Sequence, residues 1–281
     1  MGKVYDALRR AEEQRGRTVD EAAVPTPRMD WAPTPHGELP PPRRSLWRRI
    51  VARLTPHPLQ SEATARNKRR IALLQPDSFV AEQFRSLRAR IDSLAAQRPL
   101  RTLVVTSSVP GEGKTITAVN LGIVMSMSLE RKVLLVDADL RKPKIHRTLG
   151  RDPLAGLAEV LMGEAELDKA VMRPEGLKLD VLAVRGLPPN PAELLGSARM
   201  RQLLEELARR YDTVILDTPP TLSLPDSKTL SEICDGIVFV VRANETPQEE
   251  IQAALDVLDR RRVIGLVLNG AEVDEQRYRY A

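Results

Sequence analysis

The segment at residues 102–120 constrains the fold of this chain more than any other. The apolar run 103–105 leads into the polar, glycine-rich stretch 107–115, and an apolar segment that suits a helix follows. This order predicts a strand, a phosphate-binding loop and a helix. Backbone N–H groups of a tight loop and of a helix N-terminus point at an anion, and glycine lets the backbone approach it closely.

Within this loop, residues 108–115 follow the pattern G-x-x-x-x-G-K-[ST], except that Ser108 replaces the first glycine. Lys114 provides positive charge for the outer phosphates of a nucleotide, and the Thr115 hydroxyl provides a ligand for Mg²⁺. A glycine-rich surface turn is the alternative, but the position between an apolar strand and an apolar helix favours a nucleotide. The expected nucleotide contacts are Ser108, Val109, Pro110, Gly111, Glu112, Gly113, Lys114, Thr115 and Ile116.

Carboxylates are expected at the ends of two further strands. Residues 132–136 lead through a short apolar run to Asp137 and Asp139, and residues 213–216 lead to Asp217 in the same way. Ligands of open α/β sheets bind at these carboxyl ends of the strands, and Asp217 is the natural Walker B residue for hydrated Mg²⁺. One such Asp would suit a helix cap or turn equally well, but three of them favour a phosphotransfer site.

Positive charge is concentrated near the N-terminus. The formal net charge of the 281 residues is +5, but residues 1–70 hold 15 lysines and arginines against 8 acidic residues. The single Cys234, the lack of a signal-peptide pattern and the lack of an apolar run of about 18 residues predict a cytoplasmic protein without disulfides or membrane spans.

The region before residue 71 is expected to be mostly a linker. Residues 1–16 have the spacing of a short amphipathic helix, and nine prolines between positions 23 and 60 indicate a largely disordered linker across 17–70. Within it, residues 45–54 would gather Trp47 and other apolar side chains opposite an arginine face if helical. Such a segment suits an anionic membrane surface or the cytoplasmic face of a membrane protein. A solvated linker helix is an equal alternative, and we expect no nucleic acid contact because further aromatic stacking residues are missing.

Strand and helix patterns alternate across residues 71–272, which predicts an α/β domain of the P-loop NTPase class. Its doubly wound, mostly parallel sheet would be flanked by helices. Strands are expected at 102–107, 133–137, 179–183, 213–217, 237–241 and 263–268. Helices are expected at 78–96, 115–128, 155–161, 191–209, 226–233 and 247–260. Residues 273–281 would form a flexible tail.

Two further patterns lie at the edges of this domain. Glu82, Arg85 and Arg88 are spaced so that they share one face of the first helix, where an ordinary exposed Glu–Arg pair is the alternative. Tyr278 and Tyr280 are two of the four tyrosines in the chain and fall within a polar tail, which would normally be poor in aromatic residues.

Together, these motifs resemble the bacterial tyrosine kinases of capsule and exopolysaccharide synthesis, which are cytosolic P-loop enzymes. The resemblance covers roughly residues 70–281. It rests on Pro-Gly-Glu-Gly-Lys-Thr at 110–115, Asp-Ala-Asp-Leu-Arg-Lys-Pro at 137–143, Asp-Thr-Pro-Pro at 217–220 and Val-Leu-Asn at 267–269. Residues 4–12 are similar to the start of the stand-alone members.

The resemblance implies roles for the matching residues. The catalytic set would be Lys114, Asp137, Asp139 and Asp217, with Asp137 and Asp139 in the Walker A′ element and Asp137 as base for the tyrosine hydroxyl. Thr115, Asp139 and Asp217 would hold Mg²⁺, and Asn269 would contact the adenine of ATP. Glu82, Arg85 and Arg88 match the oligomerisation motif E-x-x-R-x-x-R, and Tyr278 and Tyr280 match the phosphoacceptor cluster.

The resemblance also implies partners. They are further copies of the chain, with a ring as one form, and a separate membrane-embedded chain-length regulator that recruits the chain to the inner face of the cell membrane. Two other classes stay open: a ParA/MinD-like positioning ATPase, and a catalytically weak ATP-binding scaffold. The first normally has a second lysine in K-G-G-x-G-K-T, where this chain has Val109 followed by Pro110.

Overall fold

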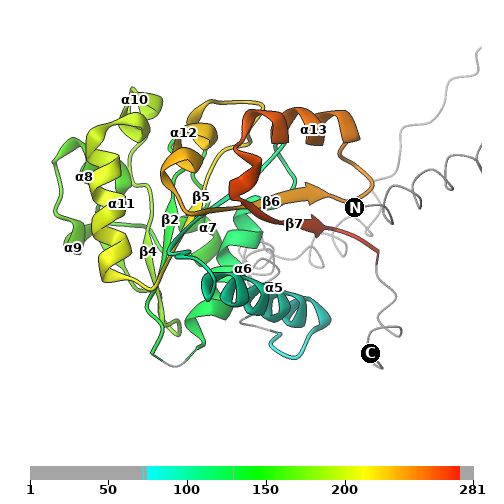
Figure 1. Ribbon diagram of the computed structural model, residues 1–281. Coiled ribbons are helices and arrows are strands. Elements are labelled where there is room, and N and C mark those ends of the chain that lie inside the picture. Colours follow the sequence, from blue (N-terminus) through cyan, green and yellow to red (C-terminus); the bar gives the residue numbers. More distant parts are fainter. Residues whose placement is uncertain (1–71, 73–74, 129, 273–281) are drawn as a thin grey trace, which may run out of the picture. The chain divides into compact units, whose positions relative to one another are not determined.

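The computed structural model describes residues 72, 75–128 and 130–272, which form a seven-stranded sheet between layers of helices (Figure 1). The strand order is β3-β4-β2-β5-β1-β6-β7. The strands are β1 (Thr102–Ser107), β2 (Val133–Asp137), β3 (Val171–Met172), β4 (Leu179–Leu182), β5 (Thr213–Asp217), β6 (Gly236–Arg242) and β7 (Val263–Asn269). All pairings are parallel except that of β3 with β4. This arrangement confirms the predicted doubly wound, mostly parallel sheet.

The helices are α5 (Phe79–Ala95), α6 (Lys114–Ser126), α7 (Ile145–Leu149), α8 (Leu157–Met162), α9 (Leu167–Ala170), α10 (Pro191–Gly196), α11 (Ala198–Arg210), α12 (Asp226–Ile233) and α13 (Gln248–Val257), with the short 3₁₀ helix η1 (Arg260–Arg262). None of the helices in the described ranges is long and apolar enough to cross a bilayer. The expected helices at 1–16 and 45–54, the linker 17–70 and the tail 273–281 lie outside the described residues.

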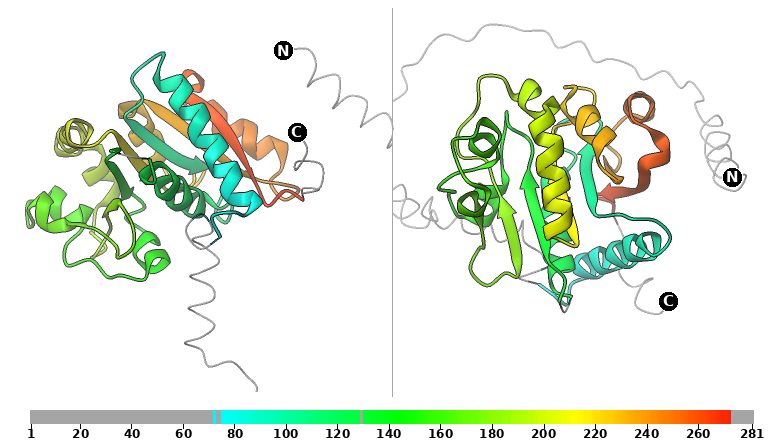
Figure 2. Two further views of the ribbon diagram at one scale, coloured as in Figure 1. Left: turned by 90° about the horizontal axis from the view of Figure 1, so that it is seen from below. Right: turned by 60° about the vertical axis from the view of Figure 1, so that its left-hand side comes forward.

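Apolar side chains alternate between the two faces of the sheet. Leu103 and Val105 of β1 face a core built with α5 and α6, whereas Val104 faces a core built with α8, α10, α11 and α12. A third cluster lies where α13 covers β6. Figure 2 shows the sheet between these helix layers. The central strands β1, β2 and β5 are buried along their whole length, which explains why their sequences are apolar on both faces.

The prediction of a single helix at 191–209 was wrong, because Ser197 separates two helices, α10 and α11. This residue is extended, its hydroxyl accepts a hydrogen bond from the Met200 N–H at 3.1 Å, and it donates one to the Leu194 carbonyl at 2.7 Å. Serine favours such an N-cap over a helix interior. The prediction also missed β3, α7 and α9, which are too short to show a hydrophobic period.

We expect replacement of Gly156 by alanine to destabilise this fold. Gly156 precedes α8, and a Cβ atom there would lie 2.4 Å from the Ala183 carbonyl oxygen and 2.8 Å from the Arg185 nitrogen. Both are backbone atoms that side-chain rotation cannot move, so Gly156→Ala should lower the free energy of unfolding by about 1–3 kcal/mol in urea titrations.

Gly265→Ala is the matched control. It lies in β7, and no atom comes within 4 Å of an added Cβ. Equal stability of the two variants would contradict the predicted clash at Gly156.

Candidate active site

The loop between β1 and α6 is shaped by two glycines with left-handed backbone angles. Gly111 has a φ of +95° and Gly113 a φ of +98°, and Gly113 directly precedes Lys114, the first residue of α6. A Cβ on Gly113 would lie 2.0 Å from the Asn269 side-chain nitrogen, whereas a Cβ on Gly111 would meet nothing within 4 Å. Gly113 is therefore required for close packing against β7, and Gly111 leaves open space beside the loop.

The Glu112 side chain turns into the protein and braces this loop. One carboxylate oxygen accepts the Val109 N–H at 2.8 Å, and the other accepts the Thr246 hydroxyl at 2.6 Å and the Arg242 N–H at 3.3 Å. The residue is only 1% exposed. The side chain thus fixes the loop against the end of β6, and the Val109 N–H serves the conformation of the loop itself. Sequence reasoning placed Glu112 and Val109 among the nucleotide contacts and missed this brace.

Asn269 ends β7 and touches the same loop. Its side-chain amide donates a hydrogen bond to the Glu112 carbonyl at 2.8 Å. The parallel pairing of β7 with β6, and of β6 with β1, brings the end of β7 to the edge of the sheet where the loop lies. Glu112 is therefore held at two points: its side chain accepts a hydrogen bond from the end of β6, and its backbone carbonyl accepts one from the end of β7.

Asp137 and Asp217 end neighbouring strands and are register partners across β2 and β5. Both are buried, with 0% and 1% of their surface exposed. The Thr115 hydroxyl hydrogen-bonds the Asp217 carboxyl, and Lys114 acts on the same group through its charge. Within the part of the chain that the structure describes, one Asp217 oxygen, Oδ1, has no hydrogen-bond partner. The loop therefore lies at the same edge of the sheet as Asp137 and Asp217, as the sequence predicts.

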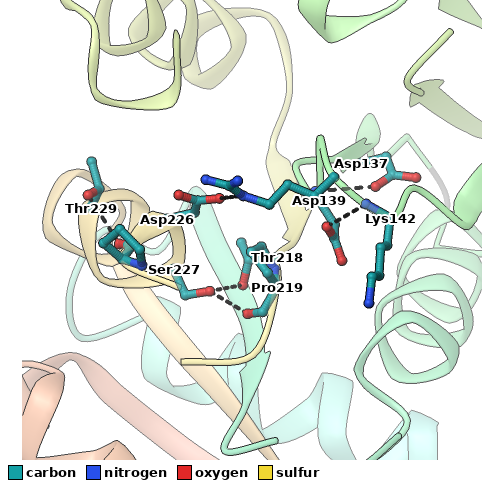
Figure 3. A network of polar contacts seen from close by, with 10 residues as sticks. Asp137, Asp139, Lys142, Thr218, Pro219, Asp226, Ser227 and Thr229 are labelled. Carbon is teal, nitrogen blue, oxygen red and sulfur yellow. Dashed lines mark hydrogen bonds and ion pairs between the residues drawn. The ribbon is translucent and has the colours of Figure 1, made fainter. Parts of the chain in front are cut away.

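The Asp137 carboxylate closes the loop that follows β2. Its Oδ2 accepts the N–H groups of Lys144 and Ile145, each at 3.0 Å, and its Oδ1 accepts the Asp139 N–H at 3.3 Å. Asp139 in turn accepts the Lys142 N–H at 3.0 Å. Figure 3 shows Asp137, Asp139 and Lys142 together in this loop. These bonds explain why α7 begins where it does.

Burial raises the pKa of both register partners. For Asp217, burial and the charge of Asp137 raise the pKa to about 8, against the Thr115 hydrogen bond and the charge of Lys114. For Asp137, burial raises the pKa to about 7, against its hydrogen bonds from Ile145 and Lys144. Two buried acids side by side disfavour the doubly ionised state, and a cation between them would favour it.

The residues fit a magnesium nucleotide better than a free metal ion. The described residues include no group of three or more acidic, histidine or cysteine side chains that could hold a metal ion. Mg²⁺ in nucleotide sites uses one or two carboxylates and completes its shell with phosphate oxygens and water. The unpartnered Asp217 oxygen, the Thr115 hydroxyl and the open space at Gly111 match that requirement.

The predicted oligomerisation residues do not share one environment. Arg85 forms a 2.6 Å ion pair with Glu82 on the exposed side of α5. Arg88 instead donates to the Val124 carbonyl of α6 at 3.1 Å, so it contributes to packing within the chain. Of the three residues, Glu82 and Arg85 pair with each other, whereas Arg88 is tied to α6.

Sequence reasoning also missed two residues at the start of α12. Asp226 forms a 3.0 Å ion pair with Arg141, which follows Asp139 in the loop after β2. Ser227 contacts the Thr218 hydroxyl at 3.2 Å. Asp226 and Ser227 carry no recognisable motif of their own, so no signal in the sequence pointed to them.

We expect Asp217→Asn to stabilise the protein in EDTA at pH 8. A carboxyl group whose pKa is raised by folding stabilises the folded state fully below its unfolded pKa of about 3.9, and that stabilisation is lost as the pH rises through the folded pKa. Asparagine removes this loss, so the melting temperature at pH 8 should rise by about 2–4 °C or more, with a clearly smaller rise at pH 5. Thermal scans at both pH values measure it.

The same variant should lose the thermal stabilisation that Mg²⁺ and ATP give the wild type, because the carboxylate is gone. A lower melting temperature of Asp217→Asn in EDTA at pH 8 would contradict the electrostatic account of this site. An undiminished response to Mg²⁺ and ATP would contradict the role of Asp217 in binding them.

Known proteins share both the sequence and the fold of this domain. A family model described as an AAA domain matches residues 100–261. The tyrosine-protein kinase YwqD of Bacillus subtilis is 38% identical over 207 residues, covering 73% of this chain and 87% of YwqD. The succinoglycan biosynthesis transport protein ExoP of Rhizobium meliloti is 32% identical over 73% of this chain, but the match spans only 27% of ExoP.

Solved structures of other proteins share the fold of this domain. The kinase domain of the Escherichia coli tyrosine kinase ETK superimposes with a TM-score of 0.68 at 32% identity, covering 73% of this chain and 81% of that domain. MinD of Pyrococcus horikoshii, in complex with Mg-ADP, reaches a TM-score of 0.52 at 22% identity over 60% of this chain and 70% of MinD, and shares the fold alone. The sequence identity to YwqD and ETK, together with the geometry of the loop and its carboxylates, shows that the chain belongs to the bacterial tyrosine-protein kinase family.

Proposed function

We propose that this chain is an ATP-dependent tyrosine autokinase that phosphorylates Tyr278 and Tyr280 in the tail of a neighbouring copy. One observation carries the proposal. The buried Asp217 carboxyl has an unpartnered oxygen at the same strand end where Thr115 and Lys114 begin α6. A carboxylate, a hydroxyl and a lysine at a helix N-terminus are the groups that bind a magnesium nucleotide and its outer phosphates.

Each residue has a distinct task in this proposal. ATP supplies the phosphoryl group, and the protein mainly positions it and neutralises charge. Lys114 stabilises charge on the outer phosphates, while Thr115, Asp217 and Asp139 hold Mg²⁺ directly or through water. Asp137 accepts the proton of the tyrosine hydroxyl, for which a pKa near 7 is well suited. Asn269 adds the adenine contact.

The tail tyrosines are better acceptors than Tyr211, the one tyrosine among the described residues. The Tyr211 hydroxyl donates to Asp180 at 3.1 Å, and burial raises its pKa to about 12. Tyr211 also lies two residues before Thr213, the first residue of β5, at the opposite end of that strand from Asp217. Tyr278 and Tyr280 instead follow β7, whose last residue touches the nucleotide loop.

Transfer between copies requires an oligomer, and α5 is the proposed contact. Glu82 and Arg85 present an exposed ion pair there. A ring built through this face would bring each tail to the next active site, and phosphates on several tails would weaken the ring by repulsion.

We further propose that the kinase regulates exopolysaccharide or capsule polymerisation and export with a membrane-embedded chain-length regulator. The similarity to ExoP, whose name refers to succinoglycan biosynthesis transport, supports the polysaccharide role. The basic residues within 1–70 would place the chain at the inner face of the cell membrane.

The two other classes of function predict a different outcome for tyrosine phosphorylation. A ParA/MinD-like ATPase or a weak scaffold would bind ATP without producing phosphotyrosine. Family membership favours the kinase, and the sequence Val109-Pro110 departs from the positioning ATPases. Phosphotyrosine on the purified chain, with and without its membrane partner, separates these classes.

We expect Lys114→Met to lower the rate of autophosphorylation by about 100-fold or more, because the negative charge on the outer phosphates is then uncompensated. In a mixture, Lys114→Met chains should still receive phosphate on Tyr278 and Tyr280. The donors are chains that lack residues 273–281 but keep Lys114. Mass spectrometry of the tail peptide measures this transfer.

Glu82→Ala with Arg85→Ala should reduce transfer in this mixture, since the proposed contact is removed while Arg88 keeps its packing role. Glu166→Ala with Lys169→Ala is the matched control, because it removes an exposed ion pair of the same spacing elsewhere. Phosphate confined to Tyr5 or Tyr211, or none on the Lys114→Met chain, would refute transfer to the tail of a neighbour.

We expect the chain to float with vesicles that contain anionic lipid and to stop floating when residues 1–60 are deleted. The reason is that residues 1–60 hold 11 lysines and arginines against 7 acidic residues and include the apolar segment around Trp47. Vesicles of neutral lipid are the control. Unchanged flotation after the deletion would place the lipid contact outside residues 1–60. No flotation of the full chain would leave a protein partner as the membrane contact.

A further inference from the structure

The start of α12 contacts both loops that carry the candidate magnesium carboxylates. Asp226 accepts a hydrogen bond from the Arg141 Nε at 3.0 Å, and Arg141 lies two residues after Asp139. The next residue of the helix, Ser227, contacts Thr218 and Pro219, which directly follow Asp217. Figure 3 shows Asp226, Ser227, Thr218 and Pro219 beside Asp137 and Asp139. Two consecutive residues thus bridge the loops after β2 and β5.

The Asp226–Arg141 pair is unusual in its burial. The Asp226 side chain is 1% exposed and the Arg141 side chain 36% exposed. Among the described residues, the second Asp226 oxygen, Oδ1, has no hydrogen-bond partner. Burying a carboxylate costs free energy that a single ion pair rarely recovers, so such a pair is weak evidence for stability. A geometric role explains its presence better than a stabilising one.

Ser227 holds α12 to a rigid part of the site. The Thr218 hydroxyl that it contacts donates to the Val105 carbonyl of β1 at 3.1 Å. The Pro219 carbonyl accepts the Thr106 hydroxyl at 2.9 Å. The helix start is therefore fixed to β1 and the end of β5, and Asp226 projects from this fixed point toward Arg141.

We propose that Asp226 is a positioning residue for the magnesium nucleotide. Through Arg141 it sets the position of the loop that carries Asp139 relative to Asp217, and so determines how tightly the site holds Mg²⁺ with the nucleotide. Asp226 itself touches neither ligand. The inference rests on the proposed function for the identity of the ligand, but it does not depend on transfer to tyrosine.

The test is the Mg²⁺ dependence of nucleotide affinity, measured with a fluorescent ATP analogue. We expect Asp226→Asn to raise the Mg²⁺ concentration needed for half-maximal tightening by about tenfold. Affinity for the nucleotide in EDTA should stay within about twofold of the wild type, because the loop around Gly111 is untouched. A merely structural role would reduce the fraction of folded protein without moving the Mg²⁺ midpoint.

Two further variants sharpen the test. Arg141→Lys keeps a positive charge near Asp226 but removes the Nε donor, so it should shift the Mg²⁺ midpoint in the same direction. Combining it with Asp226→Asn should add little, since the two residues act through one contact. Thr229→Ala is the control, because it removes only a bond to Pro225 at the exposed side of the same helix.

A wild-type Mg²⁺ midpoint in both Asp226→Asn and Arg141→Lys would overturn the proposal, as would a shift of equal size in Thr229→Ala. Strictly additive effects of Asp226→Asn and Arg141→Lys would also overturn it, because they would show two independent roles. A wild type that tightens on Mg²⁺ but forms no phosphotyrosine would contradict only the proposed kinase function.

Discussion

The parallel pairing of β5 between β2 and β1 is the contact on which the rest of the site depends. It places Asp217 beside Asp137 in register, and it brings the end of β1, where the nucleotide loop begins, to the same edge. Each strand is short and buried along its whole length, and the register of β2 on β5 cannot slip without moving a carboxylate out of the site. The chemistry of the site thus follows from the hydrophobic pairing of three strands.

That pairing has an electrostatic cost. Two carboxyl groups of like charge are buried side by side, and the rise in their pKa values records how poorly the protein alone supports both as ions. Asp137 recovers part of the cost through three backbone N–H donors, whereas Asp217 has the Thr115 hydroxyl and the charge of Lys114. The less satisfied group is therefore the one placed nearest to the start of α6. Asp137 thus closes the loop after β2, whereas Asp217 keeps one oxygen without a hydrogen-bond partner among the described residues, as its proposed Mg²⁺ role requires.

The sequence was sufficient to predict the strands that end in these carboxylates, but not the side-chain contacts that brace the loops around them. Local patterns indicate the elements in which they lie. Examples are the apolar runs that end in Asp137 and Asp217 and the loop that contains Gly113 and Lys114. The Glu112 brace and the Arg141–Asp226 pair join residues 134 and 85 positions apart, and no local period encodes such contacts. Ser197 shows the opposite case: its capping preference is local, but the helical pattern on both sides concealed it.

The end of β7 links the nucleotide loop to the tail that carries the proposed acceptors. Asn269 fills the space that a side chain at position 113 would need and holds the Glu112 carbonyl, so the loop and the strand end constrain each other. Tyr278 follows nine positions later, and an extended chain of that length spans at most about 30 Å. Asn269 therefore lies beside the candidate site of its own chain, and chain length alone does not direct Tyr278 to a neighbour. In the proposed transfer between copies, the oligomer contact selects the neighbouring site. The exposed Glu82–Arg85 pair on α5, rather than the tail, would then decide between transfer within and between copies.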